Sequence, residues 1–337
     1  MPPVSIRDVA MRAGVSVGTV SNVLNRPNLV AEATRERVRA VIGELGFVRN
    51  ESARQLRQGR SRTLGVVLES LGNPYFTDLA QGAEAAMNTD GFDALWCTSD
   101  GSAAKERRCL DFLEEQRVSG VIITPVGLDA ERIAELRDRG LSIVVLDRRA
   151  YDGVCSTRVD HVAGGELAVD HLTARHRRLA IVTGPLRSEP ITDRHAGAVA
   201  AARRAGVSED DLTTLVQRDL TPASGKEAAR RLLELDPLPT GVFCANDLLA
   251  IGLVNALLRT GVKVPEEISV VGYDDIELAG TSVVPLTTVR QPRHELGWTA
   301  AELAVAEADA EVGAAGAEEH EHRGLVLSPS LVVRDSA

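Results

Sequence analysis

The sequence predicts an N-terminal all-α headpiece with a helix-turn-helix motif, followed by an α/β core of two lobes built on parallel sheets. Two observations lead to this fold class. Apolar residues recur at helical spacing through residues 5–46. From residue 63 onward, short and continuously apolar runs alternate with longer segments of helical spacing. Buried parallel strands joined by helices give that alternation, and its repetition after about residue 157 predicts the second lobe.

The headpiece is predicted from helix start and stop signals. Ser5 can cap a first helix, and Asp8 stands three residues later, as in a capping box. Gly14 ends that helix, and Ser16 can cap a second one. Two helices this short cannot bury a core, so a third helix ending at Gly46 is required. The predicted core positions are Ile6, Val9, Ala10, Ala13, Val17, Val20, Val23, Leu24, Val38, Val41, Ile42 and Leu45.

Charge is divided unevenly along the chain. The net charge is -10, yet residues 1–62 contain 11 Arg and no Lys against 5 acidic residues, which makes this part +6. The remaining residues carry -16. A basic head on an acidic body is typical of a protein that binds phosphate at one end only.

No apolar run approaches membrane-spanning length and the N-terminus lacks a secretory pattern, so a cytoplasmic, nucleoid-associated protein is expected.

Candidate catalytic and metal motifs are weak. The stretch Gly14–Gly18 matches the G-x-S-x-G pattern of hydrolases, but a helix and not a strand precedes Ser16. The cysteines at 97, 109, 155 and 244 never form a C-x-x-C pair and are predicted to be reduced thiols. His320 and His322 lie on an acidic connector, where a solvated charge run is favoured over a metal site. We therefore predict no catalytic residue, no metal and no cofactor.

Several motifs in collinear order carry a resemblance to a known family. The first is DVAMRAGVSVGTVSNVLN at residues 8–25. The others are Asn50–Leu56, Gly72–Phe76, Val159-Asp160 with Gly164-Gly165, Cys244–Asp247, Val271–Asp275 and Pro285–Thr288. Together they resemble the lactose-repressor family of bacterial transcription factors over nearly the whole chain.

The resemblance implies a domain organisation. Residues 1–48 would form the helix-turn-helix DNA-binding domain and residues 49–62 a hinge that becomes helical on operator DNA. Residues 63–337 would form a two-lobed, periplasmic-binding-protein-like core. Lobe one is expected at about 63–157 plus 288–323, and lobe two at about 158–287 plus 324–337. The chain would then cross between the lobes near Thr157, Pro285 and Gly324.

The predicted DNA-binding residues lie in the second helix and in the hinge. Val17, Gly18 and Asn22 would face base edges, and an Asn can read adenine with two hydrogen bonds. For Val17 the alternative is packing on the headpiece core. The remaining predicted contacts of the helix are Ser16, Thr19 and Ser21. In the hinge the resemblance adds Asn50, Ala53 and Leu56, with the leucine wedged into the minor groove at the operator centre.

A small-molecule site is predicted where strand ends and helix starts converge. A polyol pocket needs carboxylate and amide acceptors, an arginine donor and an apolar face. By resemblance the effector-binding residues are Asn73, Phe76, Asp147, Arg194, Asn246 and Asp274. The family often places an aromatic residue where Leu220 stands, so the stacking face is expected to come from Tyr75, Phe76 or Trp96.

The leading hypothesis is a homodimeric repressor that binds a palindromic double-stranded operator and responds to a small polar effector, above all a sugar. Whether dimers pair into tetramers is left open. One alternative is a sugar-binding protein without a DNA role, and another is a regulator of a nucleoside-like or purine-like ligand, or of no ligand. An α/β enzyme would need a phosphate-binding glycine loop or a nucleophile with its base, and the sequence contains neither.

Overall fold

The computed structural model describes residues 4–47, 61–149, 151–310 and 321–337. The chain separates into two compact units, Met1–Arg60 and Ser61–Ala337, which we treat one at a time. The predicted hinge contacts Asn50, Ala53 and Leu56 lie outside the described residues, as does His320. No described helix is long and apolar enough to cross a membrane.

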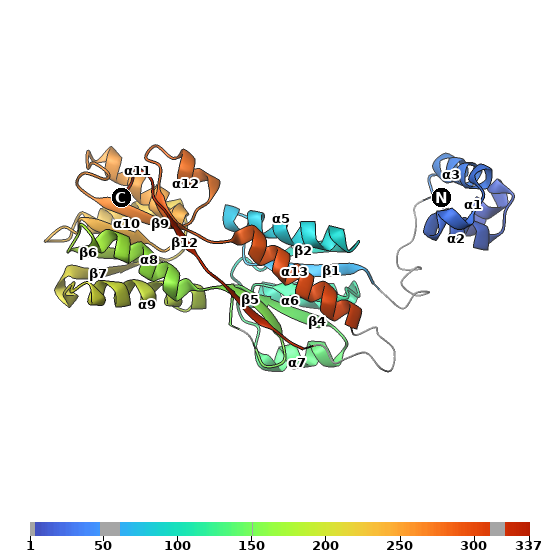
Figure 1. The fold of residues 1–337 in the computed structure, drawn as a ribbon, viewed down its shortest axis with the longest axis horizontal. Helices are drawn as coiled ribbons and strands as arrows, with labels where there is room; N and C mark the ends of the chain where they lie inside the picture. Colours follow the sequence, from blue (N-terminus) through green and yellow to red (C-terminus); the bar gives the residue numbers. More distant parts are fainter. Residues whose placement is uncertain (1–3, 48–60, 150, 311–320) are drawn as a thin grey trace. The chain divides into compact units, whose positions relative to one another are not determined.

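The headpiece consists of three α-helices around one small core (Figure 1). They are α1 (Ile6–Ala13), α2 (Val17–Asn25) and α3 (Glu32–Leu45), with a 3-10 turn at Pro27–Leu29. Ser5 and Asp8 form the predicted capping box, and Gly14 ends α1 in the left-handed conformation at φ 64°. The Ser16 side chain caps α2 by accepting from the backbone N–H of Thr19. Val9, Val20 and Val38 are fully buried where the helices meet.

The core unit contains two six-stranded sheets, each covered by helices on both faces (Figure 1). The first has the order β11-β5-β4-β3-β1-β2, and the second β12-β10-β9-β8-β6-β7. The first sheet is formed by β1 (Thr63–Leu68), β2 (Asp93–Thr98), β3 (Gly120–Ile123), β4 (Ser142–Leu146), β5 (Cys155–Val159) and β11 (Gly324–Leu327). The second is formed by β6 (Leu179–Thr183), β7 (Leu212–Val216), β8 (Gly241–Cys244), β9 (Ser269–Asp274), β10 (Thr287–Arg290) and β12 (Ser330–Val332). Every pairing is parallel except that of β10 with β12.

The helices follow the predicted alternation. Around the first sheet they are α5 (Pro74–Thr89), α6 (Ala103–Glu115), α7 (Ala130–Asp138) and α13 (Arg293–Ala310). Around the second they are α8 (His161–Thr173), α9 (Glu189–Arg204), α10 (Pro222–Leu232), α11 (Asp247–Arg259) and the short α12 (Glu277–Thr281). One face of the first sheet packs on α5 and α13 and the other on α6 and α7. The second sheet lies between α8 with α9 and α10 with α11.

The points where the chain crosses between the sheets fall a few residues later than predicted. β5 continues to Val159 in the first sheet, and β11 at Gly324–Leu327 also belongs to that sheet. β10 at Thr287–Arg290 pairs with β9 in the second sheet, before α13 returns to the first. The predicted boundaries near 157, 285 and 324 precede the observed crossings by a few residues, because each crossing segment first completes a strand that neighbouring strands hold by backbone hydrogen bonds.

Candidate functional site

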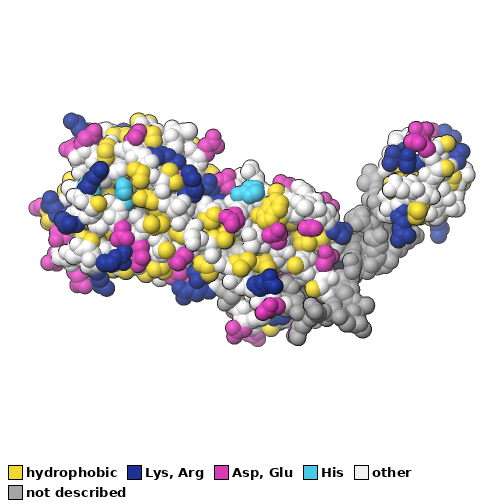
Figure 2. Space-filling model, in the orientation of Figure 1, with side chains coloured by type: hydrophobic (Ala, Val, Ile, Leu, Met, Phe, Trp, Pro, Cys, Tyr) yellow, Lys and Arg dark blue, Asp and Glu magenta, His cyan; other side chains and the backbone are white. Residues whose placement is uncertain are grey.

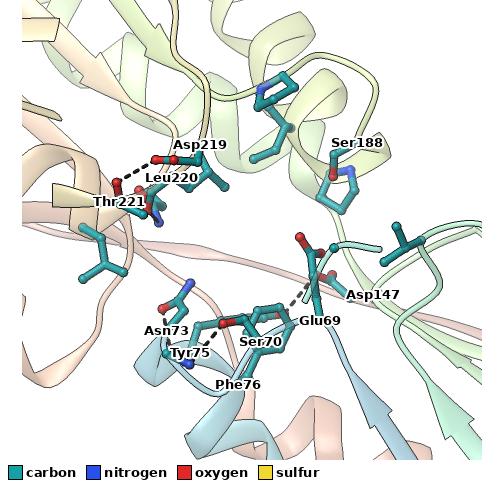
Figure 3. A pocket seen from close by; sticks show the side chains of 18 of the residues that line it. Glu69, Ser70, Asn73, Tyr75, Phe76, Asp147, Ser188, Asp219, Leu220 and Thr221 are labelled. Atoms are coloured by element: carbon teal, nitrogen blue, oxygen red, sulfur yellow. Dashed lines mark hydrogen bonds between the residues drawn. The ribbon is translucent and has the colours of Figure 1, made fainter. Parts of the chain in front are cut away.

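A cavity of about 660 Å³ opens between the two sheets of the core unit, at the carboxyl ends of their strands. This is where ligands bind in open parallel α/β sheets. All six predicted effector residues line the cavity: Asn73, Phe76, Asp147, Arg194, Asn246 and Asp274. Figure 3 shows Asn73, Tyr75 and Phe76 on one side of the space and Asp219, Leu220 and Thr221 on the other. The structure thus brings together residues that stand 201 positions apart in the chain, from Asn73 to Asp274.

The two asparagines are positioned as helix caps. Asn73 precedes α5, and its Oδ1 accepts from the backbone N–H of Tyr75 at 3.1 Å. Asn246 precedes α11; its Oδ1 accepts from the N–H of Leu249 at 2.9 Å, and its Nδ2 donates to the carbonyl of Leu220 at 3.2 Å. The capping bonds satisfy helix N–H groups and fix both side chains at the cavity wall.

A chain of buried hydrogen bonds joins the two lobes through His161, a residue that the sequence argument missed. Its Nε2 lies 2.8 Å from Asp147 Oδ1, and the Tyr75 hydroxyl donates to Asp147 Oδ2 at 3.0 Å. On the other side, Arg194 Nε donates to His161 Nδ1 at 3.2 Å, and the Tyr273 hydroxyl lies 3.1 Å from the same nitrogen. An Nδ1 that accepts from Arg194 carries no proton, so His161 is neutral and donates through Nε2 to Asp147.

The pKa values follow from this burial and pairing. Desolvation lowers the pKa of His161, and the Arg194 charge adds to the effect while Asp147 opposes it. Burial disfavours the ionised form of Asp147, but His161, Arg148 and Arg194 outweigh it and lower the pKa of Asp147 to about 2. Burial raises the pKa of Asp274 to about 6 against the pull of Arg194. At neutral pH the cavity floor therefore holds two carboxylates, one guanidinium and one neutral imidazole.

Arg194 is only 5% exposed, and several neighbouring groups fix the position of its guanidinium. Its Nη1 donates to the Ala245 carbonyl at 2.9 Å and lies 3.6 Å from Asp274 Oδ1. The guanidinium carbon stands 3.9 Å from the ring centre of Tyr273, a cation–π distance. Gln291 Nε2 donates to Asp274 Oδ1 at 2.7 Å. A buried arginine held in this way is preorganised to donate to a ligand.

Backbone conformation also marks the site. Asp147 has φ 57° and Asp274 has φ 114°, in the region that residues with a Cβ rarely adopt. Both stand at the ends of strands, β4 and β9, where the turn aims the carboxylate into the cavity. Such strain of about 1–3 kcal/mol per residue persists where surrounding structure enforces it, and it gathers at binding sites.

The paired glycines of the Val159–Gly165 motif have a steric role. A Cβ at Gly164 would stand 2.2 Å from the Tyr273 hydroxyl, and one at Gly165 would stand 2.0 Å from the Arg194 carbonyl. Any larger residue at either position would push α8 away from Tyr273 and from α9. Since α8 begins with His161 and α9 carries Arg194, the glycines set the distance between these two side chains.

Two of the three expected aromatic residues form the apolar side of the cavity. Tyr75 and Phe76 line it, with their rings 5.0 Å apart in an edge-to-face arrangement, and Leu220 lies opposite. Trp96 does not contribute to the lining: it sits on β2 and is 37% exposed. The proposal that Trp96 replaces the missing aromatic residue is therefore wrong, because β2 is the outer strand of the first sheet.

On the headpiece, the predicted contact residues share the start of α2. Gly18, Asn22 and Ser16 are exposed, and Thr19 and Ser21 are partly so. Ser16 Oγ caps the helix and also lies 2.9 Å from Thr19 Oγ1, so the two hydroxyls pair with each other. Val17 is half-buried and packs against the headpiece core. Figure 2 shows both basic and acidic side chains on the visible face of each unit.

Acid is expected to destabilise the native protein partly through His161. Because its pKa is lowered in the folded state, the unfolded chain binds the extra proton as pH falls below the ordinary value near 6.5. The contribution of His161 to the free energy of unfolding is therefore present above that pH and is lost as the pH falls below it. Thermal unfolding of wild type and His161→Asn between pH 7.5 and 5.5 should show the smaller loss in the variant. Equal losses would mean that His161 does not contribute to this dependence.

Comparison with known proteins places these features in a family. Residues 5–50 match the family described as bacterial regulatory proteins, lacI family, and residues 169–337 match the periplasmic binding protein-like domain. The chain is 31% identical over 335 residues to the HTH-type transcriptional repressor PurR of Photobacterium profundum, covering 98% of each chain. It is 34% identical over 337 residues to the ribose operon repressor of Escherichia coli, covering 99% of each.

Solved structures agree with the sequence comparison. The lac repressor dimer bound to operator and the anti-inducer ONPF superimposes with a TM-score of 0.84 at 29% identity, covering 99% of both chains. The helical headpiece and the two-sheet core are thus parts of one known fold. The chain belongs to the lacI family of bacterial regulatory proteins and is a DNA-binding transcriptional repressor with a small-molecule effector.

Proposed function

We propose that the cavity between the lobes is the effector site and that its ligand is a sugar. The observation that carries this is the joint placement of Asp147, Arg194 and Asp274 at the cavity floor. Two ionised carboxylates accept from ring hydroxyls and one guanidinium donates to them, which is the chemistry that a polyol requires. Asn73 and Asn246 add amide groups at the wall.

A purine-like ligand is the second candidate, since one relative is named PurR. A flat base would need exposed aromatic faces for stacking. Here Tyr75 is 3% exposed and Phe76 is 8% exposed, and Leu220 stands opposite them. The small apolar surface suits the face of a pyranose or furanose better than a base. The name of the ribose operon repressor points to the same ligand class.

A thermal-shift measurement separates the two ligand classes. D-ribose and other monosaccharides should raise the unfolding midpoint in proportion to the logarithm of concentration above Kd. Adenine and adenosine should leave it unchanged. A shift with the purines alone would overturn the sugar assignment, and in that case the cavity would remain the effector site only if Arg194→Ala removed the shift.

For the DNA side we propose a homodimer that binds a palindromic operator, one headpiece to each half-site. A single headpiece buries too small an interface for tight specific binding. The proposed contacts are those of the second helix and the hinge, with Val17 supporting the helix from its packed position. The two lobes can adopt a more open or a more closed arrangement. An effector that binds one arrangement more tightly shifts the equilibrium toward it, and operator affinity changes by the ratio of the effector's two affinities. In the cell such a protein would stay with the nucleoid.

Leu56 gives the sharpest test of the hinge. A leucine inserted between base steps costs a few kcal/mol of unstacking, which the contacts of the bent duplex return. Leu56→Ala should therefore weaken operator binding by ~10-fold or more, while binding to random DNA changes little. Titrating both DNAs side by side decides the matter. Equal losses on both would mean that Leu56 only packs against protein.

A further inference from the structure

Three side chains outside the cavity converge on one point of lobe one. They are Cys155 at the start of β5, Glu307 near the end of α13, and His322 just before β11. One ligand atom of each lies within 4.8 Å of the other two. Cys155 is fully buried and Glu307 is only 5% exposed, while the His322 side chain is 28% exposed. We propose that this cluster binds a zinc ion, with water as the fourth ligand.

The distances fit the metal. His322 Nδ1 lies 3.3 Å from Glu307 Oε1 and 3.8 Å from Cys155 Sγ. Zinc bonds of about 2.0–2.3 Å to nitrogen, oxygen and sulfur set tetrahedral ligand separations of roughly 3.3–3.8 Å. The two separations from His322 therefore fall in this range, and Cys155 Sγ and the Glu307 carboxylate lie within 4.8 Å of each other. Thiolate, imidazole and carboxylate are also the ligands that zinc accepts together, whereas calcium and magnesium prefer oxygen alone.

The surroundings favour a thiolate once a cation is present. The backbone N–H of Arg323 donates to Cys155 Sγ at 3.3 Å, a bond that stabilises negative charge on sulfur. Without a metal, burial and the neighbouring Glu307 raise the pKa of Cys155 to about 12, so the thiol keeps its proton. Zinc would displace that proton to solvent and form the S–Zn bond in its place.

One contact opposes the metal and gives a specific prediction. Arg137 Nη2 lies 3.3 Å from His322 Nε2. When Arg137 donates to Nε2, the His322 proton is on Nδ1, the atom that would bind zinc. Metal binding moves that proton to Nε2 and turns Arg137, which is exposed, toward solvent. Removing this guanidinium should therefore tighten zinc binding, whereas loss of a ligand should weaken it.

The experiment uses the full-length protein, stripped with a chelator and dialysed. Titration with Zn²⁺ against a competing chromophoric chelator should give one site per chain and a raised unfolding midpoint. Co²⁺ should give the near-ultraviolet absorption of a cobalt–thiolate bond, and about one proton should be released for each zinc bound. Cys155→Ser should abolish the thiolate absorption. His322→Gln, a change at a partly exposed side chain that the fold tolerates, should weaken zinc by ~100-fold or more.

The controls distinguish the other places where metal could bind. Cys97→Ser removes a thiol on β2 that lies outside the cluster, and it should change nothing. Arg137→Ala should bind zinc at least as tightly as wild type. His320→Gln tests the sequence-adjacent histidine: if zinc depends on His320 and survives Cys155→Ser and Glu307→Gln, it binds the connector alone and the proposal is overturned. Absence of stoichiometric binding to the wild type would overturn it as well.

Discussion

Operator affinity should fall by ~10³–10⁵ between about 50 and 200 mM salt, because binding of 6–10 phosphates releases their counterions. This steep dependence is expected although the whole chain carries -10. The net positive charge is confined to residues 1–62, and charges farther than about 8–10 Å from the phosphates are largely screened at moderate ionic strength. The slope of log affinity against log salt, measured by fluorescence anisotropy, checks the expectation.

Two arginine variants calibrate the slope. Arg7 is exposed on α1 of the headpiece, and Arg203 is exposed on α9 of the core. If Arg7 meets a phosphate, Arg7→Ala should reduce the slope by about one, while Arg203→Ala should leave it unchanged. A shallow wild-type slope, or an equal change from both variants, would contradict the view that the headpiece carries the phosphate contacts.

Arg194→Ala should raise the D-ribose concentration needed for a response by ~100-fold or more, because it removes the one buried guanidinium that faces the ligand among the described residues of the cavity floor. Operator affinity without ligand should stay near wild type, since Arg194 belongs to the core unit and the proposed DNA contacts belong to the headpiece and hinge. Operator titrations with and without the sugar measure both quantities at once.

The variant also removes the guanidinium that pairs with Asp274, and breaking a buried ion pair costs about 3–5 kcal/mol of stability. Adding Asp274→Asn to Arg194→Ala should recover much of that stability without restoring the response to sugar. Arg204→Ala is the matched control, because Arg204 lies on the same helix but is exposed and pairs with Asp170. A normal response in Arg194→Ala would mean that the effector binds elsewhere.

Local signals were sufficient for most elements. Ser5, Gly14 and Ser16 act through backbone groups a few residues away, so their capping roles can be predicted from spacing alone. The strands Ser142–Leu146 and Gly241–Cys244 belong to the predicted alternation of short apolar runs with helices from residue 63 onward. These two runs are fully buried, and their burial is the main force that places them. The six effector residues were reached by resemblance, and the structure places all of them around one cavity.

The sequence alone determined the basic headpiece and the alternating α/β core, because these depend on periodicity, caps and charge along the chain. It also determined the place in a repressor family, because the motifs that carry the resemblance are local stretches of sequence. Only the tertiary structure decided the rest. In the sequence, His161 is an ordinary residue that follows a strand. The structure shows that its two ring nitrogens bond to Asp147 and Arg194. Cys155 and Glu307 are 152 positions apart in the chain and become neighbours only through the packing of α13 beside β5. Side-chain chemistry that depends on non-local contacts has no periodicity to reveal it, so folding must first bring the groups together.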